Sequence, residues 1–246
     1  MARYKLTLAY DGTAFFGSQR QARRRTVQSE LEKAARGLGW KGSSLLLAGR
    51  TDAGVHATGQ VAALDMDWDH GSDSLRDALN AGLPTDLVVL DVQQVGDGFH
   101  PRFDAIARRY CYDVRCGPLK HPLEDRLAWR VWPPVHVSEL NRAARLLRGT
   151  HDFGVFGSAA RKGGDTSRAV TVSEWKAEDA TFHYHIVATG FLYRMVRRLV
   201  FVQVAMAQGK CSEAALREAL ESGRRIPGLP AGTAPARGLR LVEVEY

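Results

Sequence analysis

The chain has 246 residues, which at about 150 residues per domain allows one large domain or two smaller ones. Its composition, 45% apolar and 25% charged, is that of an ordinary globular protein and excludes a mainly disordered chain. The net charge is +7, and 27 of the 34 basic residues are arginines. Arginine binds phosphate oxygens through two parallel hydrogen bonds, so this surplus suits a nucleic-acid partner, although a base-composition bias of the genome produces the same surplus.

Targeting, disulfide and metal signals are missing from the sequence. The N-terminal residues lead into an alternating pattern without the apolar stretch of a signal peptide, and no apolar run reaches the roughly 18 residues that span a bilayer. We therefore expect a soluble cytoplasmic protein without membrane contact. Cys111, Cys116 and Cys211 form no C-x-x-C motif, so we expect packing roles for them. His183 and His185 lack an obvious third ligand, and no metal is assigned.

Hydrophobic periodicity predicts six elements in the first hundred residues. They are a strand over 3–10, a helix capped by Thr26 and stopped by Gly39, strands over 44–48 and 60–64, a helix around 75–83 ended by Pro84, and a strand over 87–95. This order of elements is typical of a ferredoxin-like unit.

The same order of elements repeats in the second part of the chain. The expected elements are a strand over 105–114, a helix from a Ser138 cap to Leu147, strands over 169–175 and 182–188, helices over 191–207 and 212–220, and a strand over 239–246. We therefore predict an α+β fold of two ferredoxin-like halves, residues 1–104 and 105–246, with their sheets side by side. A cleft between the halves is where a ligand is expected.

The loop between the predicted strands 44–48 and 60–64 combines a carboxylate with a guanidinium. Arg50 and Asp52 lie there between two glycines. Taken alone, an aspartate beside glycine is typical of a turn.

The predicted helix 191–207 is apolar nearly all round, as a buried helix is, and carries Arg194, Arg197 and Arg198 on one face. A guanidinium in such a helix needs an anionic partner or must extend to water. Pairing of Arg197 with Asp52 would keep that carboxylate ionised.

Two further features suit RNA. Tyr110 shares a face of its predicted strand with Arg108, and tyrosine beside arginine can hold splayed-out bases and phosphates, although an amphipathic strand at the edge of the core has the same pattern. A basic loop carries Arg20, Arg23, Arg24 and Arg25, which are candidate phosphate contacts or a solvated charge run. Because these arginines lie outside the apolar periodicity, we expect glutamines at positions 23–25 to leave folding almost unchanged. Neither a P-loop nor a dinucleotide-binding motif is present, so we expect no nucleotide cofactor.

The loop GRTDAGVHATGQV at residues 49–61 resembles the active-site signature of the tRNA pseudouridine synthase A family. Further matching segments follow the family order: LAYDGT at 8–13, TVQ at 26–28, FHPRFDA at 99–105, RRY at 108–110, GTHDF at 149–153, FLYRMVR at 191–197 and APARGL at 234–239. The resemblance therefore extends over nearly the whole chain.

The resemblance implies a function and a role for each matched residue. The family isomerises uridine to pseudouridine on the 3′ side of the tRNA anticodon stem-loop, at tRNA positions 38, 39 and 40, without a cofactor and as a homodimer. Its fold is a pair of ferredoxin-like halves with the catalytic cleft at the centre. By resemblance, Asp52 is the catalytic aspartate, Tyr110 stacks on the target base, Arg197 pairs with Asp52, and Arg50 contacts the RNA beside the flipped nucleotide.

The chain departs from the family pattern at three positions. Ser18 stands where an aromatic residue is common, Cys111 where a basic residue is usual, and Phe201 where glycine is usual. Two other functions remain open on the residues alone. A non-catalytic RNA-binding protein would use the same arginines and tyrosines but has no need of Asp52, because a carboxylate repels phosphates. A hydrolase with an aspartate nucleophile would use Asp52 and Arg197 but leaves the basic loop unexplained.

Overall fold

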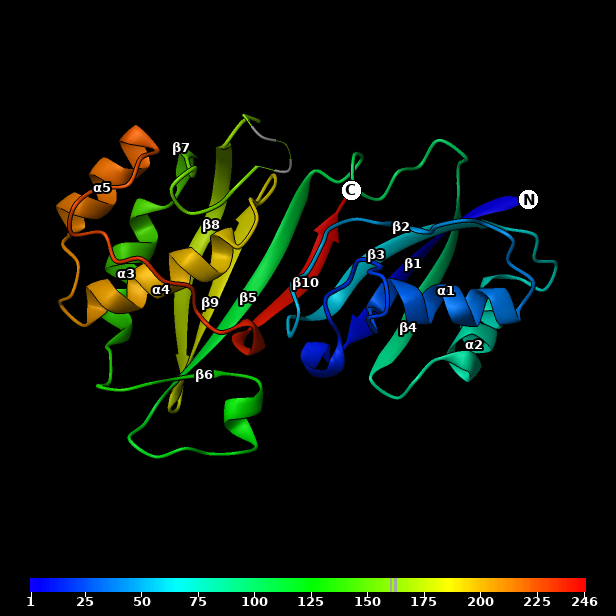
Figure 1. The fold of residues 1–246 in the computed structure, drawn as a ribbon, viewed down its shortest axis with the longest axis horizontal. Coiled ribbons are helices and arrows are strands. Elements are labelled where there is room, and N and C mark those ends of the chain that lie inside the picture. Colours follow the sequence, from blue (N-terminus) through cyan, green and yellow to red (C-terminus); the bar gives the residue numbers. More distant parts are fainter. Residues whose placement is uncertain (160, 162) are drawn as a thin grey trace. The chain divides into compact units, whose positions relative to one another are not determined.

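The computed structural model describes residues 1–159, 161 and 163–246 as a mixed α+β protein (Figure 1). Its contacts divide the chain into two compact units. The first unit comprises Met1–Ile106 together with Arg240–Tyr246, and the second comprises Ala107–Leu239. By its contacts, the end of the chain thus belongs with the first unit, whereas the pattern of elements grouped it with the second. The division into domains at residues 104 and 105 stays a prediction.

The first unit contains the six elements expected from periodicity and one additional strand. They are β1 (Ala2–Tyr10), α1 (Val27–Gly37), β2 (Leu46–Leu47), β3 (His56–Met66), α2 (Ser72–Gly82), β4 (Leu87–Val95) and β10 (Leu239–Glu245), with a short 3-10 helix η1 (Gly12–Ala14) after β1. β1 lies between β4 and β3 and is antiparallel to both. β2 pairs with β3 in the antiparallel sense, and β10 pairs with β3 in the parallel sense.

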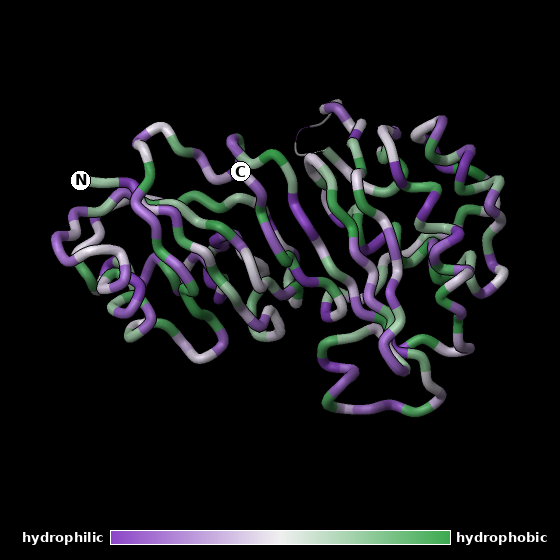
Figure 2. Tube along the Cα trace, turned by 180° about the vertical axis from the view of Figure 1, so that it is seen from behind, coloured by the Kyte–Doolittle hydropathy of each residue, from purple (hydrophilic) through white to green (hydrophobic). Residues whose placement is uncertain are grey.

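Local sequence accounts for β1 and α1. Every second residue of β1 from Tyr4 to Tyr10 is buried, which is the period of a strand with one face toward the core. Figure 2 shows hydrophilic and hydrophobic residues, in purple and green, interspersed along the chain. Thr26 caps α1 by accepting a hydrogen bond from the Ser29 amide, and the Ser29 hydroxyl accepts one from the Thr26 amide in return.

β3 begins four residues earlier than its sequence predicts. Gly59 lies within the observed strand, and a Cβ atom at this position would lie 2.1 Å from the Val242 carbonyl oxygen of β10. Glycine within a strand often marks such a close approach of two backbones. The glycine therefore belongs to the strand because a neighbouring strand leaves no space for a side chain.

Among its described residues, the second unit contains six of the elements expected from periodicity and four short elements that the sequence did not indicate. Its elements are β5 (Ala107–Cys116), η2 (Glu124–Arg126), β6 (Trp129–Val131), α3 (Val137–Leu146), β7 (Gly149–Asp152), β8 (Ser167–Glu178), β9 (Thr181–Ala188), α4 (Met195–Ala207), α5 (Glu213–Ser222) and η3 (Ala236–Gly238). The strands follow the order β5-β9-β8-β7, all antiparallel, and β6 runs parallel to the end of β5.

Helices α3 and α4 cover one face of this sheet. The buried rings of Tyr184 and Trp175 stack at 4.9 Å, and Trp175 Nε1 donates a hydrogen bond of 2.8 Å to Gln203 Oε1 on α4. The Ser173 hydroxyl donates to the Ala144 carbonyl of α3 at 2.8 Å. The other face of the sheet therefore carries the alternate residues of β5 and β9.

Two predicted helix starts in this unit are wrong. Ser138 lies inside α3, because the His136 carbonyl already accepts the Leu140 amide and His136 is the N-cap. Helix α4 begins at Met195, after Arg194 with a left-handed φ of 62°, so Arg194 does not share a helical face with the arginines that follow. The Tyr193 amide donates to the Ser158 carbonyl at 3.0 Å, which draws residues 191–194 away from the helical path.

Helix α4 is buried along most of its 13 residues, as its apolar sequence predicts. Within the described part of the chain, no helix combines the length and the apolar character needed to cross a membrane.

Candidate active site

The loop that carries Asp52 is fixed through the residue that precedes it. Thr51 is buried, and its amide donates a hydrogen bond of 2.8 Å to the Ser18 hydroxyl. The Ser18 amide donates in return to the Thr51 carbonyl at 3.1 Å, and the Thr51 and Tyr10 hydroxyls lie 2.8 Å apart. Burial raises the pKa of Tyr10, so its hydroxyl keeps its proton at neutral pH. Strand β1 and residues 11–18 therefore hold the loop in one conformation.

Two glycines allow the loop to pack this closely. Gly17 has a φ of 88°, and a Cβ atom there would lie 2.7 Å from the Thr51 carbonyl oxygen. Gly54 has a φ of 79° and is the third residue of a tight turn that is closed by a hydrogen bond of 3.1 Å from the Val55 amide to the Asp52 carbonyl. A left-handed φ favours glycine at both positions.

The far end of the loop is held by side chains of β3. Gln60 Nε2 donates to the Gly49 carbonyl at 2.9 Å, and the Gly12 amide donates to His56 Nδ1 at 3.0 Å. Asp52 itself is half-buried, and Arg50 is exposed. Hydrogen bonds therefore hold the backbone on both sides of Asp52 in a defined conformation.

For three of these supporting residues, no role was predicted from the sequence. Tyr10 and Gln60 lie in segments that match the family, which is the signal that points to them. Ser18 departs from the family pattern, yet it is completely buried and makes two hydrogen bonds with the Thr51 backbone, one through its hydroxyl and one through its amide. A small hydroxyl side chain at position 18 therefore supports the Asp52 loop from within the first unit.

Tyr110 lies on β5 of the second unit. It is opposite Ile186 of β9, and its ring meets the edge of the Phe191 ring at a centroid distance of 5.0 Å. Only 8% of Tyr110 is exposed. The Tyr110 ring is therefore held in a single orientation between β9 and the segment that contains Phe191.

Arg197 lies in the first turn of α4 and is half-buried. Its Nε donates a hydrogen bond of 2.8 Å to the Ala234 carbonyl, and the Ala234 amide donates to the Arg197 carbonyl at 3.0 Å. The next residue, Pro235, accepts a hydrogen bond of 2.8 Å from the Tyr112 hydroxyl. Burial raises the pKa of Tyr112, and the nearby guanidiniums of Arg197 and Arg237 act in the opposite direction. The APARGL segment, which matched the family without an assigned role, thus positions Arg197.

The basic loop divides into two kinds of arginine. Arg23 and Arg24 are exposed, and Arg24 lies over the Phe16 ring at 4.4 Å. Arg20 instead pairs with the fully buried Glu32 at 2.6 Å, and Arg25 forms two hydrogen bonds of 2.7 Å to Asp86. Arg25 thus joins the residues before α1 to the residue before β4, a contact that the expectation of almost unchanged folding did not include. Contact of these four arginines with RNA stays a prediction.

We predict that Arg25→Gln lowers the free energy of unfolding by about 1 kcal/mol at neutral pH. The Arg25 guanidinium lowers the pKa of Asp86 below its usual value. Stability from such a carboxylate is fully present above the pKa of the unfolded state and is lost as the pH falls through the lower, folded-state pKa. We therefore expect the difference in the free energy of unfolding between variant and parent, measured with urea, to be smaller at about pH 2 than at pH 7. Arg23→Gln is the control, and an equal difference at both pH values would contradict the role of the pair.

The predicted site residues fall in both units. Arg50, Asp52 and the basic loop belong to the first, and Tyr110 and Arg197 belong to the second. The pairing of Asp52 with Arg197 stays a prediction.

Comparison with known proteins gives matches over the whole chain. A family model described as tRNA pseudouridine synthase matches residues 7–104 and 143–246. A tRNA pseudouridine synthase A of Geobacillus kaustophilus is 42% identical over 99% of this chain and 94% of its own length. Proteins of the same name from Geobacillus sp. and Paramagnetospirillum magneticum are 39% and 38% identical, over 99% and 100% of this chain and 98% and 96% of their own lengths. The chain belongs to the tRNA pseudouridine synthase family.

Proposed function

We propose that this protein isomerises uridine to pseudouridine in the anticodon stem-loop of tRNA. The observation that carries the proposal is the GRTDAGVHATGQV loop, which matches the family signature and holds Asp52 on a backbone fixed at both ends. The full-length similarity to proteins named tRNA pseudouridine synthase A supports tRNA as the substrate. The exposed arginines of the basic loop suit its phosphates.

The isomerisation of uridine needs few functional groups from the protein. The N-glycosidic bond of uridine breaks, the base turns, and a bond forms between the sugar and a ring carbon, while the proton released from that carbon is balanced by one taken up at the ring nitrogen. No oxidant or reductant is consumed. Ionised Asp52 is proposed to start the reaction by attacking the sugar, by adding to the ring, or by removing a sugar proton.

The remaining roles place RNA around this carboxylate. We assign Arg197 to the electrostatic support of Asp52, Arg50 to the RNA beside the target, and Tyr110 to stacking on the extruded base. We also propose that each half of the chain has a ferredoxin-like fold. It is supported in the first unit by the order of elements from β1 to β4 and by the strand order β4-β1-β3-β2.

The family resemblance also leads us to propose a homodimer that acts in the cytoplasm, where mature tRNA is used. Sedimentation at several protein concentrations tests the dimer. A species of monomer mass at all concentrations would contradict it.

Nucleoside analysis of tRNA after incubation with the protein tests the proposed function. We expect pseudouridine to appear in the anticodon stem-loop without any added cofactor. Bound but unmodified tRNA would indicate an RNA-binding protein, and neither binding nor modification would favour a hydrolase of small substrates.

Tyr110→Ala is expected to lower kcat/KM for tRNA by about 10- to 100-fold, because stacking of a base on an aromatic ring is worth about 1–3 kcal/mol. Tyr110→Phe keeps the ring and serves as the matched control for the hydroxyl. Full turnover in the phenylalanine variant would assign stacking alone, and reduced turnover would assign a proton-transfer role to the hydroxyl. Full turnover in the alanine variant would remove Tyr110 from the site.

The double variant Arg23→Gln and Arg24→Gln is expected to bind tRNA with a weaker dependence on salt. Each lost phosphate contact lowers the slope of log affinity against log salt by about 0.7–0.9, so two contacts lower it by about 1.5. Arg25 is left in place because it holds Asp86. The control is Arg76→Gln on α2, whose guanidinium pairs with Asp73 and Asp77. Equal slopes for variant and parent would show that the loop is only a solvated run of charge.

A further inference from the structure

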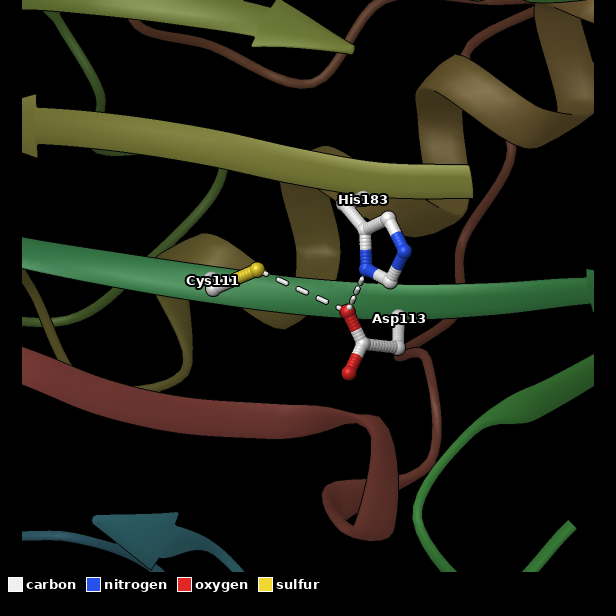
Figure 3. Close-up of side chains that lie close together, drawn as sticks. All are labelled: Cys111, Asp113 and His183. Carbon is white, nitrogen blue, oxygen red and sulfur yellow. Dashed lines mark hydrogen bonds and ion pairs between the residues drawn. The ribbon is translucent and has the colours of Figure 1, made fainter. Parts of the chain in front are cut away.

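Three side chains with different donor atoms meet on the face of the second unit's sheet opposite α3 and α4. They are Cys111 and Asp113 of β5 and His183 of β9 (Figure 3). The Cys111 sulfur lies 3.5 Å from Asp113 Oδ1, and His183 Nδ1 lies 2.7 Å from the same oxygen. The three ligand atoms all lie within 4.8 Å of one another.

Strand register brings these residues together. Asp113 pairs directly with His183 across the two antiparallel strands. Cys111 lies two residues before Asp113 and therefore projects from the same face. In the sequence, His183 was considered only together with His185 of the same strand. Cys111 and Asp113 could not be recognised as its partners because they lie on a strand about 70 residues earlier in the chain.

The donor set and its spacing suit zinc. Thiolate, imidazole and carboxylate are the three ligand types that Zn²⁺ takes in proteins. In a tetrahedral zinc site, the usual bond lengths separate sulfur from oxygen by about 3.5 Å and nitrogen from oxygen by about 3.3 Å. The sulfur–oxygen distance here already equals the first value. Binding would replace the hydrogen bonds that Cys111 and His183 make with Asp113 by bonds to the ion, and the Cys111 thiol would release its proton to solvent.

A fourth residue is placed to orient the imidazole. His183 Nε2 lies 3.5 Å from a carboxylate oxygen of Glu178, whose side chain is 79% exposed. A carboxylate that accepts the second N–H of a metal-bound histidine is a common feature of zinc sites and leaves the first nitrogen available for the metal. The neighbouring Lys176 is directed to Glu174, at 3.3 Å. The His183 side chain is 22% exposed, which gives an ion access to an otherwise buried group.

We propose that Cys111, Asp113 and His183 form a three-ligand binding site for Zn²⁺, with solvent as the fourth ligand. The bound ion would join β5 to β9 directly beside Tyr110. The site is separate from the residues proposed for uridine isomerisation, and it holds whether or not that function is correct. It also gives a role to Cys111, one of the departures from the family pattern.

Titration with Co²⁺ as a spectroscopic substitute for Zn²⁺ tests the site. We expect one equivalent to bind with a thiolate-to-cobalt charge-transfer band that Zn²⁺ abolishes. Cys111→Ser should lose the band, and His183→Asn should bind at least tenfold more weakly. Cys116→Ser and Cys211→Ser are matched controls that should keep it, because burial raises the pKa of both thiols and neither belongs to a three-donor group among the described residues.

The absence of a band in the parent protein, or its persistence in Cys111→Ser, would overturn the proposal. If either ligand variant does not fold, the exposed Glu178 decides the question. Glu178→Gln should fold normally and weaken Zn²⁺ binding by about 10- to 100-fold in competition titrations. An unchanged Kd in that variant would count against His183 as a ligand and thus against the site.

Discussion

Replacement of Asp52 by asparagine is expected to reduce pseudouridine formation by about 10⁴-fold or more, while tRNA still binds. Asparagine keeps the shape of the side chain but removes the charge on which every proposed route depends. The loop should be preserved, because its conformation is fixed by backbone hydrogen bonds of Thr51 and Val55. Single-turnover assays of nucleoside composition measure the loss, and filter binding measures the affinity.

The matched control for this variant is Asp69→Asn, which removes an exposed carboxylate from the same unit. It should keep normal turnover. Measurable single-turnover formation of pseudouridine by Asp52→Asn at a rate near that of the control would remove Asp52 from the catalytic role. A loss of tRNA binding equal to the loss of turnover would instead make Asp52 a binding residue.

Arg197→Met is expected to lower kcat by about 10²- to 10³-fold, the usual effect of removing one fixed electrostatic contact from a transition state. Methionine retains the apolar part of the side chain within α4. The change also removes the Nε donor to the Ala234 carbonyl, which should lower the free energy of unfolding by about 1 kcal/mol. Steady-state kinetics and urea unfolding separate the two effects.

Arg198→Met is the control for charge on the same helix, and it should leave kcat nearly unchanged. Arg197→Lys should recover part of the activity if charge is what matters, because lysine retains the cation but not the planar fork. A variant Arg197→Met that is destabilised as expected but turns over normally would limit Arg197 to a structural contact with residue 234.

Helices and strands that depend on residues close together in the chain could be predicted from the sequence. The Thr26 cap of α1 and the alternation of β1 each depend on residues close together in the chain. The pattern of predicted strands also placed Asp52 in a loop between two strands, where the structure has it. Such features follow from capping and periodicity, which a single sequence displays directly.

Features that depend on distant partners could not be predicted. Ser18 supports Thr51 across 33 residues, and Arg25 reaches Asp86 across 61. The start of α4 depends on a hydrogen bond from Tyr193 to Ser158, which competes with the helix that the apolar sequence favours. In each case tertiary contact overrides the local pattern or adds a role that the pattern does not contain.

The parallel pairing of β10 with β3 has a consequence for the order in which the protein is made. A ribosome completes all of the second unit before it adds residues 240–246, yet these residues belong to the first unit. While the chain is growing, the edge of β3 at His56 and Ala57, directly after the Asp52 loop, therefore lacks its native neighbour. An open strand edge can pair with other chains. The first unit thus becomes complete only after the second unit has been synthesised, when β10 pairs with β3 beside the Asp52 loop.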